Sequence, residues 1–469
     1  MQIRSWFIVL AIGVCGVGRI KADEAEDKSV AAIEKLGGKV SRDDTKPGKP
    51  IVGVSMGGPE VTDAVLKELA TLKNLTSLEV ASPKVTDSGL KELAQLKGLT
   101  YLFLWCTEVT DTGLKEFTQL KGLNKLGLIL PKMTDAGLKE IGQLKGLTYL
   151  GLHGIKGTPA GVKELAQLKE LDYLDLSNTM FSGEGLKELA QLNKLTVLVL
   201  NGTQVTDAGL KEIAQLKALT DLGLAGTLVT DAGLKDIPQL KALTSLGLTG
   251  TKVTDVGLKE IPQLKALTTL YLNFTGVTDA GLKEIAQLKG LVYLDLSNTM
   301  VSGEGLKELT PLKGLTTLLL TGTKVTDAGL KEIAQLKALT KLYLGGTKVT
   351  DGGLKELAPL VGLTTLFLNF TEVTDAGLKE IAQLKVLTDL GLSGTKVEGV
   401  GLKELVPLKG LAHLDLMGTK LTDAGLKEIA QLKALTYLNL AGDKVTDAGV
   451  AELKKALPKC MIDTLPTPP

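Results

Sequence analysis

The chain has 469 residues, and its 54 lysine and arginine residues almost balance 53 acidic residues, which leaves a formal net charge of +1. A near-neutral chain lacks the basic excess typical of nucleic-acid-binding proteins, so its net charge gives no support for a nucleic-acid partner. Its length would ordinarily indicate about three globular domains, but a repetitive chain of this length can fold as one solenoid.

The first 22 residues have the pattern of a secretory signal. Arg4 precedes an apolar run over residues 6–17, and Ala22 ends a passable cleavage site. The run is shorter than the ~20 residues that a transmembrane helix needs. We therefore predict that residues 1–22 are a signal peptide and that the protein is exported to the periplasm, the cell surface or the medium. No stable membrane span is expected after cleavage.

Two features leave alternatives to a cleaved signal peptide open. Arg19 and Lys21 follow the apolar run and disfavour cleavage, so an uncleaved membrane anchor is the alternative. Cys15 is a candidate lipidation site, but Val14 precedes it, where lipoprotein signals have a small residue. Cleavage after residue 22 is therefore the favoured interpretation.

Residues 23–50 are predicted to cap the N-terminal end of the solenoid. Residues 25–37 place Ile33 and Leu36 on the apolar side of a helix, and residues 42–50 form a loop into the first strand.

From residue 51 to residue 457 the chain repeats every 24 residues without an insertion or deletion. One column, occupied by Leu66 in the first unit, is leucine in every one of 17 units except two, where Val162 and Val450 replace it. An uninterrupted period of this length indicates a solenoid whose units share one continuous core.

Each unit combines one strand with one short helix, as residues 195–218 illustrate. Leu198 and Leu200 lie two residues apart, which places them on one face of a strand. Thr206 and Asp207 offer a side-chain oxygen to cap a helix, and the apolar residues after them recur with helical spacing.

The pattern Leu-x-x-Leu-x-Leu-x-x-Thr-x-Val resembles the signature of the leucine-rich repeat family. The recurring segment Val-Thr-Asp-Ala-Gly-Leu-Lys-Glu is most similar to the ribonuclease-inhibitor-like and F-box-associated subclass, here in an exported bacterial type. No F-box-like domain is recognised before the repeats, so no ubiquitin-ligase function is inferred. The family usually has Asn or Cys at the ninth position, where this chain has Thr in 12 units, and a Thr hydroxyl can bond a neighbouring backbone group.

The resemblance implies an α/β fold, a horseshoe-shaped solenoid with parallel strands on the concave face and short helices on the convex face. Residues 458–469 are predicted as a C-terminal cap and a Pro-rich tail. Cys106 and Cys460 are separated by about fourteen strands, which at ~4.8 Å per strand lies beyond disulfide reach. We therefore expect the continuous core to hold the fold without cross-links.

The resemblance also implies that the third, fifth and seventh strand positions face outward on the concave side. All seven tyrosines lie in the third or fifth column. Exposed aromatic clusters mark partner sites, although stacking between coils is the alternative explanation. The predicted partner-binding residues are Tyr101, Phe103, Trp105, Ile129, Leu130, Tyr149, His153 and Tyr173. A second, weaker patch comprises Tyr271, Tyr293, Tyr343 and Phe367. Phe274 and Phe370 lie in a column that is usually Gly, and either join this patch or tuck under the turn.

No constellation for catalysis or metal binding is evident. The two histidines lie eleven units apart, and Asp175, Asp295 and Asp415 recur every five units, too far apart for a metal site or a catalytic pair. His153, Asp175 and Ser177 are a chance set on adjacent strands rather than a hydrolytic trio. We therefore predict a non-enzymatic protein without metal or cofactor.

The sequence thus favours a binding scaffold that recognises a protein or other macromolecule, and no nucleic acid, on its concave face. The alternative is an architectural protein of the bacterial envelope without a single specific partner. An exposed Trp105 separates the two hypotheses, because a structural role does not require it.

Overall fold

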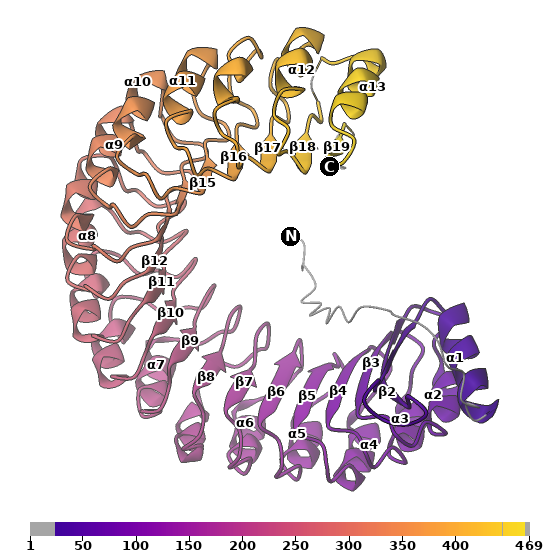
Figure 1. Cartoon of the computed structure of the whole chain (residues 1–469). Coiled ribbons are helices and arrows are strands. Elements are labelled where there is room, and N and C mark those ends of the chain that lie inside the picture. Colours follow the sequence, from indigo (N-terminus) through magenta and orange to yellow (C-terminus); the bar gives the residue numbers. More distant parts are fainter. Residues whose placement is uncertain (1–23, 443, 465–469) are drawn as a thin grey trace. The chain divides into compact units, whose positions relative to one another are not determined.

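The computed structural model describes residues 24–442 and 444–464. They form two compact units that divide between Asn124 and Lys125 and are taken separately below. Both units repeat one coil, in which a strand, a turn and a helical segment follow each other (Figure 1). None of the helices in the described ranges is long and apolar enough to cross a membrane. The predicted signal peptide lies outside the described residues, and so does the Pro-rich tail at residues 465–469.

The first unit begins with a capping helix and a short antiparallel strand. Strand β1 pairs antiparallel with β2, whereas β2, β3 and β4 are parallel and in register at intervals of 24 residues. Strand β1 was not predicted, because none of its four side chains is buried and no alternation of apolar residues marks it. The bounds are α1 (Glu24–Lys35), β1 (Lys39–Arg42), β2 (Ile51–Gly57), β3 (Ser77–Ser82) and β4 (Tyr101–Cys106).

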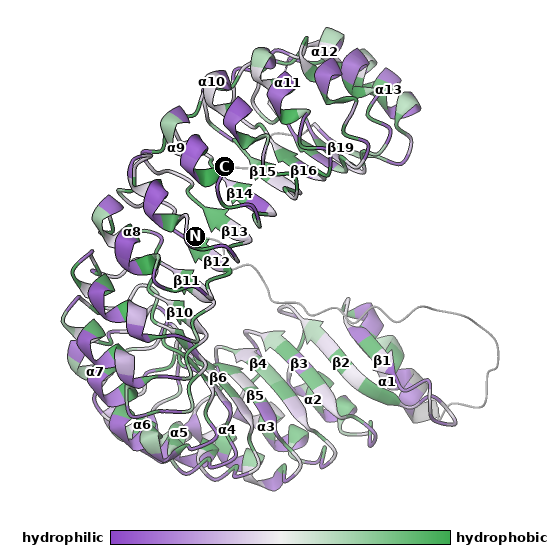
Figure 2. Cartoon of the chain, turned by 60° about the vertical axis from the view of Figure 1, so that its left-hand side comes forward, coloured by the Kyte–Doolittle hydropathy of each residue, from purple (hydrophilic) through white to green (hydrophobic). Residues whose placement is uncertain are grey.

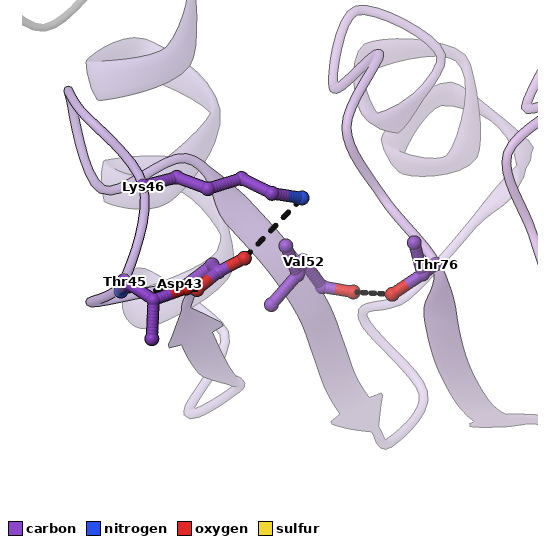
Figure 3. A network of polar contacts seen from close by, with 5 residues as sticks. All are labelled: Asp43, Thr45, Lys46, Val52 and Thr76. Atoms are coloured by element: carbon purple, nitrogen blue, oxygen red, sulfur yellow. Dashed lines mark hydrogen bonds and ion pairs between the residues drawn. The ribbon is translucent and has the colours of Figure 1, made fainter.

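The loop between β1 and β2 is held by its own side chains (Figure 3). Asp43 accepts hydrogen bonds from the backbone N–H of Thr45 at 3.0 Å and from its hydroxyl at 2.5 Å, and Lys46 Nζ lies 3.3 Å from the same carboxylate. The bonds from Thr45 lower the pKa of Asp43. On the neighbouring coil, Thr76 donates its hydroxyl to the carbonyl of Val52 at 3.0 Å.

In the second unit, strands β5 to β19 pair in parallel and in chain order. They line the inner side of this unit, and its helices cover the outer side (Figure 1). Strand β19 lies within residues predicted as a cap and adds one strand beyond the last repeat. The bounds are β5 (Lys125–Ile129), β6 (Tyr149–His153), β7 (Tyr173–Asp175), β8 (Val197–Val199), β9 (Asp221–Gly223), β10 (Ser245–Gly247), β11 (Thr269–Tyr271), β12 (Tyr293–Asp295), β13 (Thr317–Leu319), β14 (Lys341–Tyr343), β15 (Thr365–Phe367), β16 (Asp389–Gly391), β17 (His413–Asp415), β18 (Tyr437–Asn439) and β19 (Met461–Asp463).

Helical structure follows each strand from β2 to β18, as predicted, but several segments are 3-10 helices, and after β4, β14 and β15 an α-helical and a 3-10 part adjoin. In η3 and η4 the cause is Pro238 and Pro262, which remove a backbone donor from the segment. The first unit contains α2 (Asp63–Leu69), α3 (Asp87–Leu93), α4 (Asp111–Leu114) and η1 (Lys115–Gln119). The second contains α5 (Asp135–Ile141), α6 (Pro159–Leu165), η2 (Leu186–Gln191), α7 (Asp207–Ile213), η3 (Gly233–Gln239), η4 (Gly257–Gln263), α8 (Asp279–Ile285), η5 (Gly305–Leu309), α9 (Asp327–Ile333), α10 (Asp351–Leu354), η6 (Lys355–Leu357), η7 (Asp375–Gly377), α11 (Leu378–Ile381), η8 (Leu402–Leu405), α12 (Asp423–Ile429) and α13 (Asp447–Ala456).

The core of each coil is closed by leucine from both the strand and the helical segment. Leu198, Leu200 and Leu210 are fully buried, and hydrophobic segments alternate with hydrophilic ones along the helices (Figure 2). The threonine at the ninth position closes the turn within its own coil: Thr203 donates its hydroxyl to the carbonyl of Leu200 at 2.6 Å. The same bond recurs in other coils, for example from Thr299. In these coils the Thr side chain therefore satisfies a carbonyl of its own coil. Thr107 differs, because its hydroxyl donates to the carbonyl of Pro83 in the preceding coil at 3.5 Å.

The helix cap predicted from residues 206–207 is corrected by the structure. Thr206 occupies the N-cap position of α7, but its side chain makes no cap hydrogen bond. The equivalent Thr278 does accept a hydrogen bond, from the N–H of Ala280 at 3.2 Å. The difference lies in the preceding coil. Asp255 of that coil accepts the hydroxyl hydrogen of Thr278 and orients it, whereas the equivalent residue before Thr206 is Gly183, which has no carboxylate.

Candidate binding face

In the first unit, strand β4 turns three aromatic side chains away from the core. Tyr101 and Phe103 are half-buried, and Trp105 is 51% exposed. In register with Trp105 lies Ala81, and in register with Ala81 lies Gly57. These small neighbours leave that side of the indole without a large side chain against it. Trp105 is therefore an exposed aromatic ring beside small residues on the neighbouring strands.

A polar group borders these aromatic side chains on β2 and β3. The hydroxyl of Tyr101 lies 3.1 Å from Glu79 Oε1, and Ser55 donates its hydroxyl to Glu79 Oε2 at 3.0 Å. The aromatic surface of the first unit thus ends in a carboxylate with two hydroxyl partners.

In the second unit, Tyr149 and Tyr173 stack with ring centroids 4.5 Å apart. Both are half-buried, and burial, followed by the charge of Asp175, raises the pKa of each phenol. His153 Nε2 lies 3.6 Å from Asp175 Oδ2, and the half-buried Ile129 is in register with His153. The structure therefore brings together Ile129, Tyr149, His153 and Tyr173.

Leu130 does not belong to this surface, and its prediction as a binding residue was wrong. Its side chain is fully buried. Leu126 and Leu128 of β5 are buried as well, and Leu130 continues this alternation by one residue. In the coils from Gly154 onward, the residue at the position equivalent to Leu130 has a positive φ angle, and the backbone turns away from the core there.

The set His153, Asp175 and Ser177 is not arranged as a hydrolytic triad. Asp175 Oδ1 accepts hydrogen bonds from the hydroxyl of Ser177 at 2.5 Å and from its backbone N–H at 2.8 Å. The serine is therefore held by the carboxylate instead of the imidazole, the reverse of what nucleophile activation requires. Within the described residues no group of three or more His, Cys, Asp or Glu side chains is placed to hold a metal ion.

The second predicted patch consists of two separate ring pairs. Tyr271 and Tyr293 lie 4.9 Å apart with their rings tilted, and Tyr343 and Phe367 stack at 5.1 Å with an interplanar angle of 11°. All four side chains are half-buried. Burial raises the pKa of the three tyrosines, with an aspartate of the same face as the second cause.

Phe274 and Phe370 point into solvent and do not tuck under the turn. They are 61% and 65% exposed, and their φ angles are 58° and 57°. In neighbouring coils this left-handed position is held by Gly or Asn, which tolerate it at lower cost than a bulky side chain.

Sequence reasoning missed a hollow of about 270 Å³ between strands β15 and β18. Gly391 stands in the fifth column, directly after the coils that carry Tyr343 and Phe367 there, and Phe367 leans over it: a Cβ at this glycine would lie 2.4 Å from Phe367 Cδ1. A fifth-column glycine beside aromatic coils was the only signal in the sequence. The hollow is lined by Phe367, Asp389, Leu390, His413, Leu414, Asp415 and Tyr437.

A family model described as Leucine Rich repeat matches residues 71–94, 191–214, 264–286, 336–358 and 411–430. A solved leucine-rich repeat protein from Leptospira interrogans is similar over 87% of this chain and 100% of its own, at 31% identity and a TM-score of 0.57. The chain belongs to the leucine-rich repeat family. No curated protein matches it.

Two further solved structures are similar to this leucine-rich repeat protein. An internalin from Listeria monocytogenes is 25% identical over 70% of this chain and 83% of its own, with a TM-score of 0.47. A plant peptide hormone receptor, solved in complex with RGF2, is 17% identical over 88% of this chain and 73% of its own, with a TM-score of 0.42. Leucine-rich repeat folds commonly mediate protein binding and generally serve as non-enzymatic scaffolds.

Proposed function

We propose that this leucine-rich repeat protein binds a protein partner through the inward-facing strand columns of its coils, without catalysing a reaction. The observation that carries the proposal is the exposure of Trp105, which is 51% exposed although its neighbours Leu104 and Cys106 are fully buried. A large aromatic ring in solvent adds little to the fold and is typical of a binding hot spot.

The inward columns of the second unit support the same proposal. Its tyrosines are half-buried, while leucine already completes the core beneath them. Partly exposed tyrosines supply apolar area and a hydroxyl at low cost in conformational entropy, which suits a contact surface.

An architectural role is the competing proposal, and the stacked rings favour it in part. The pairs Tyr149–Tyr173 and Tyr343–Phe367 each join adjacent coils, and such pairs contribute ~0.5–1.5 kcal/mol to stability. Trp105 has no such ring partner among the described aromatic pairs, so it distinguishes the two roles.

The test is capture of proteins from the envelope fraction of the source organism by immobilised wild type, Trp105→Ala and Val361→Ala. Val361 is an apolar residue in the turn after η6 that is 74% exposed, so its variant controls for loss of exposed apolar area. We expect a protein retained by wild type and Val361→Ala but lost with Trp105→Ala. Equal retention by all three would contradict the proposal.

We further propose that binding takes place outside the cytoplasm, after removal of residues 1–22. The support is the sequence pattern of that segment. Fractionation of a bacterial host followed by N-terminal sequencing tests this proposal. We expect an exported product that begins near residue 23, and a cytoplasmic product that retains Met1 would overturn it.

A further inference from the structure

The hollow over Gly391 combines aromatic walls with carboxylates. Phe367 forms one wall: its ring stacks on Tyr343 at 5.1 Å, and the ring edge with Cδ1 leans over Gly391, where a Cβ would lie 2.4 Å away. Tyr437 lies on the opposite side of the hollow, and its ring centroid is 6.4 Å from that of His413. The faces of these rings carry negative charge density, which attracts cations.

The two aspartates of the hollow differ in how many polar contacts their carboxylates already make with the protein. Asp389 accepts from the hydroxyl of Thr388 at 2.5 Å, and its Oδ1 lies 2.8 Å from His413 Nδ1. Asp415 Oδ1 accepts one hydrogen bond, from the backbone N–H of Met417 at 3.2 Å. Among the described residues, the second oxygen of Asp415 has no protein donor. This oxygen retains its capacity to accept a hydrogen bond in the hollow.

The charges around the hollow are of one sign. From β15 to β19 the inward-facing columns contain three aspartates and no lysine or arginine: the aspartates are Asp389, Asp415 and Asp463. Lys341 is the nearest cation on this face, and it lies on β14, two strands before Asp389. Burial and the charges of Asp463 and Asp415 raise the pKa of Tyr437, in keeping with a negative local potential. The chain as a whole has a net charge of +1, so this face is more acidic than the average of the chain.

We propose that this hollow binds an arginine side chain of a polypeptide partner, with the guanidinium stacked on Phe367 and paired to Asp415. The inference rests on the proposed function and names the chemistry of the partner at one place on the face. A guanidinium is planar, keeps its charge at every physiological pH, stacks on aromatic rings and donates to a carboxylate in a fork. A lysine ammonium is a compact point charge and uses the aromatic wall less well.

The experiment measures binding of a fluorescein-labelled arginine tetrapeptide to the full chain by fluorescence polarisation at low salt. The matched probes are the citrulline tetrapeptide, which is nearly isosteric but neutral, and the lysine tetrapeptide. The variants are Asp415→Asn and, as the control, Asp221→Asn, which removes the same charge from β9 of the same unit. Melting curves of all variants verify that each is folded.

We expect the arginine peptide to bind, the citrulline peptide to bind at least tenfold more weakly, and the lysine peptide at least threefold more weakly. Asp415→Asn is expected to weaken arginine binding at least tenfold, whereas Asp221→Asn changes it less than twofold. Equal loss in both variants, or equal binding of arginine and lysine peptides, would overturn the assignment. The proposed function is decided separately by the Trp105→Ala capture experiment, so the two proposals can fail independently.

Discussion

Asp255 at the start of one helical segment holds Thr278 at the start of the next. The carboxylate accepts from the backbone N–H of Thr278 at 2.9 Å and from its hydroxyl at 2.6 Å, and the Thr278 oxygen in turn accepts from the N–H of Ala280 at 3.2 Å. The same arrangement recurs in other coils, for example between Asp87 and Thr110. An aspartate–threonine ladder on the helical side thus connects successive coils, in place of a ladder formed by the ninth strand position.

The ladder has gaps in coils whose aspartate is replaced. Gly183, Gly303 and Gly399 occupy the aspartate position. The following N-cap residues Thr206, Thr326 and Thr422 make no side-chain cap bond. The aspartate of the preceding coil and the threonine cap are therefore lost together in all three coils, which indicates that the carboxylate orients the threonine.

The ladder predicts a position-dependent effect of removing one aspartate. Asp255→Ala deletes two hydrogen bonds to a charged acceptor and is expected to lower the free energy of unfolding by ~1.5–3 kcal/mol. Asp447 at the start of α13 is exposed and accepts no hydrogen bond from a threonine among the described residues. Asp447→Ala is therefore the control, and the loss of its interaction with the helix dipole is expected to cost ~0.3–1 kcal/mol. Urea denaturation measures both, and equal costs would contradict the ladder.

We expect the fold to tolerate replacement of the aromatic side chain of Phe370. Its φ of 57° is costly for a bulky residue, and Asn178 and Asn298 hold the same column at φ values of 58° and 54°. Phe370→Asn is expected to leave the free energy of unfolding unchanged or raise it by up to ~1 kcal/mol, although a large aromatic side chain is lost. Phe370→Ala, which gains no such tolerance, is expected to be ~1 kcal/mol less stable than Phe370→Asn. A cost of 2 kcal/mol or more for Phe370→Asn in thermal or urea unfolding would indicate that the ring packs as core.

The regular part of the fold could be predicted because one period controls it. Positions such as Leu198, Leu200 and Leu210 recur every 24 residues, and their burial follows from strand and helix spacing alone. The contacts between coils could not be read in this way. Whether Thr206 is capped depends on Gly183 in the preceding coil, which no pattern within one unit reveals.

For the candidate face, the sequence predicts which strand positions point outward, but it does not predict which residues at these positions form a site. The inward exposure of Trp105 follows from its strand position, but the burial of Leu130 depends on whether the chain keeps its alternation for one more residue. The hollow over Gly391 arises where a side chain is missing and Phe367 leans across coils. Such a feature comes from the packing of several coils, so composition and spacing give little warning of it.

The two described cysteines are expected to differ in reactivity. Cys106 is fully buried, and burial raises the pKa of its thiol to about 11, whereas Cys460 is only partly buried. A pKa of 11 leaves roughly a hundredfold less thiolate at pH 8 than an ordinary thiol has, and the thiolate is the reactive form. Iodoacetamide should therefore modify Cys460 and spare Cys106 until the protein unfolds, as peptide mass mapping can determine.

The same raised pKa has a consequence for stability. The protonated Cys106 is favoured in the fold, so its contribution is complete below the pKa of an unfolded thiol and is lost as the pH rises towards 11. Urea midpoints between pH 8 and pH 11 should therefore decline less for Cys106→Ala than for the wild type. An identical decline in both proteins would show that the fold does not raise the pKa of this thiol above its value in the unfolded chain.

The last prediction compares Trp105 with its neighbour Leu104. Trp105→Ala removes an exposed side chain and is expected to change the free energy of unfolding by no more than ~0.5 kcal/mol, while a hot-spot aromatic typically contributes ~2–4 kcal/mol to binding. Leu104 is fully buried, so Leu104→Ala should cost ~2–5 kcal/mol of stability through the cavity that it leaves. Thermal melting and partner capture, measured on both variants, distinguish surface from core. If Trp105→Ala lowers the melting temperature as much as Leu104→Ala does, Trp105 serves the fold, and the proposed binding face loses the residue that carries it.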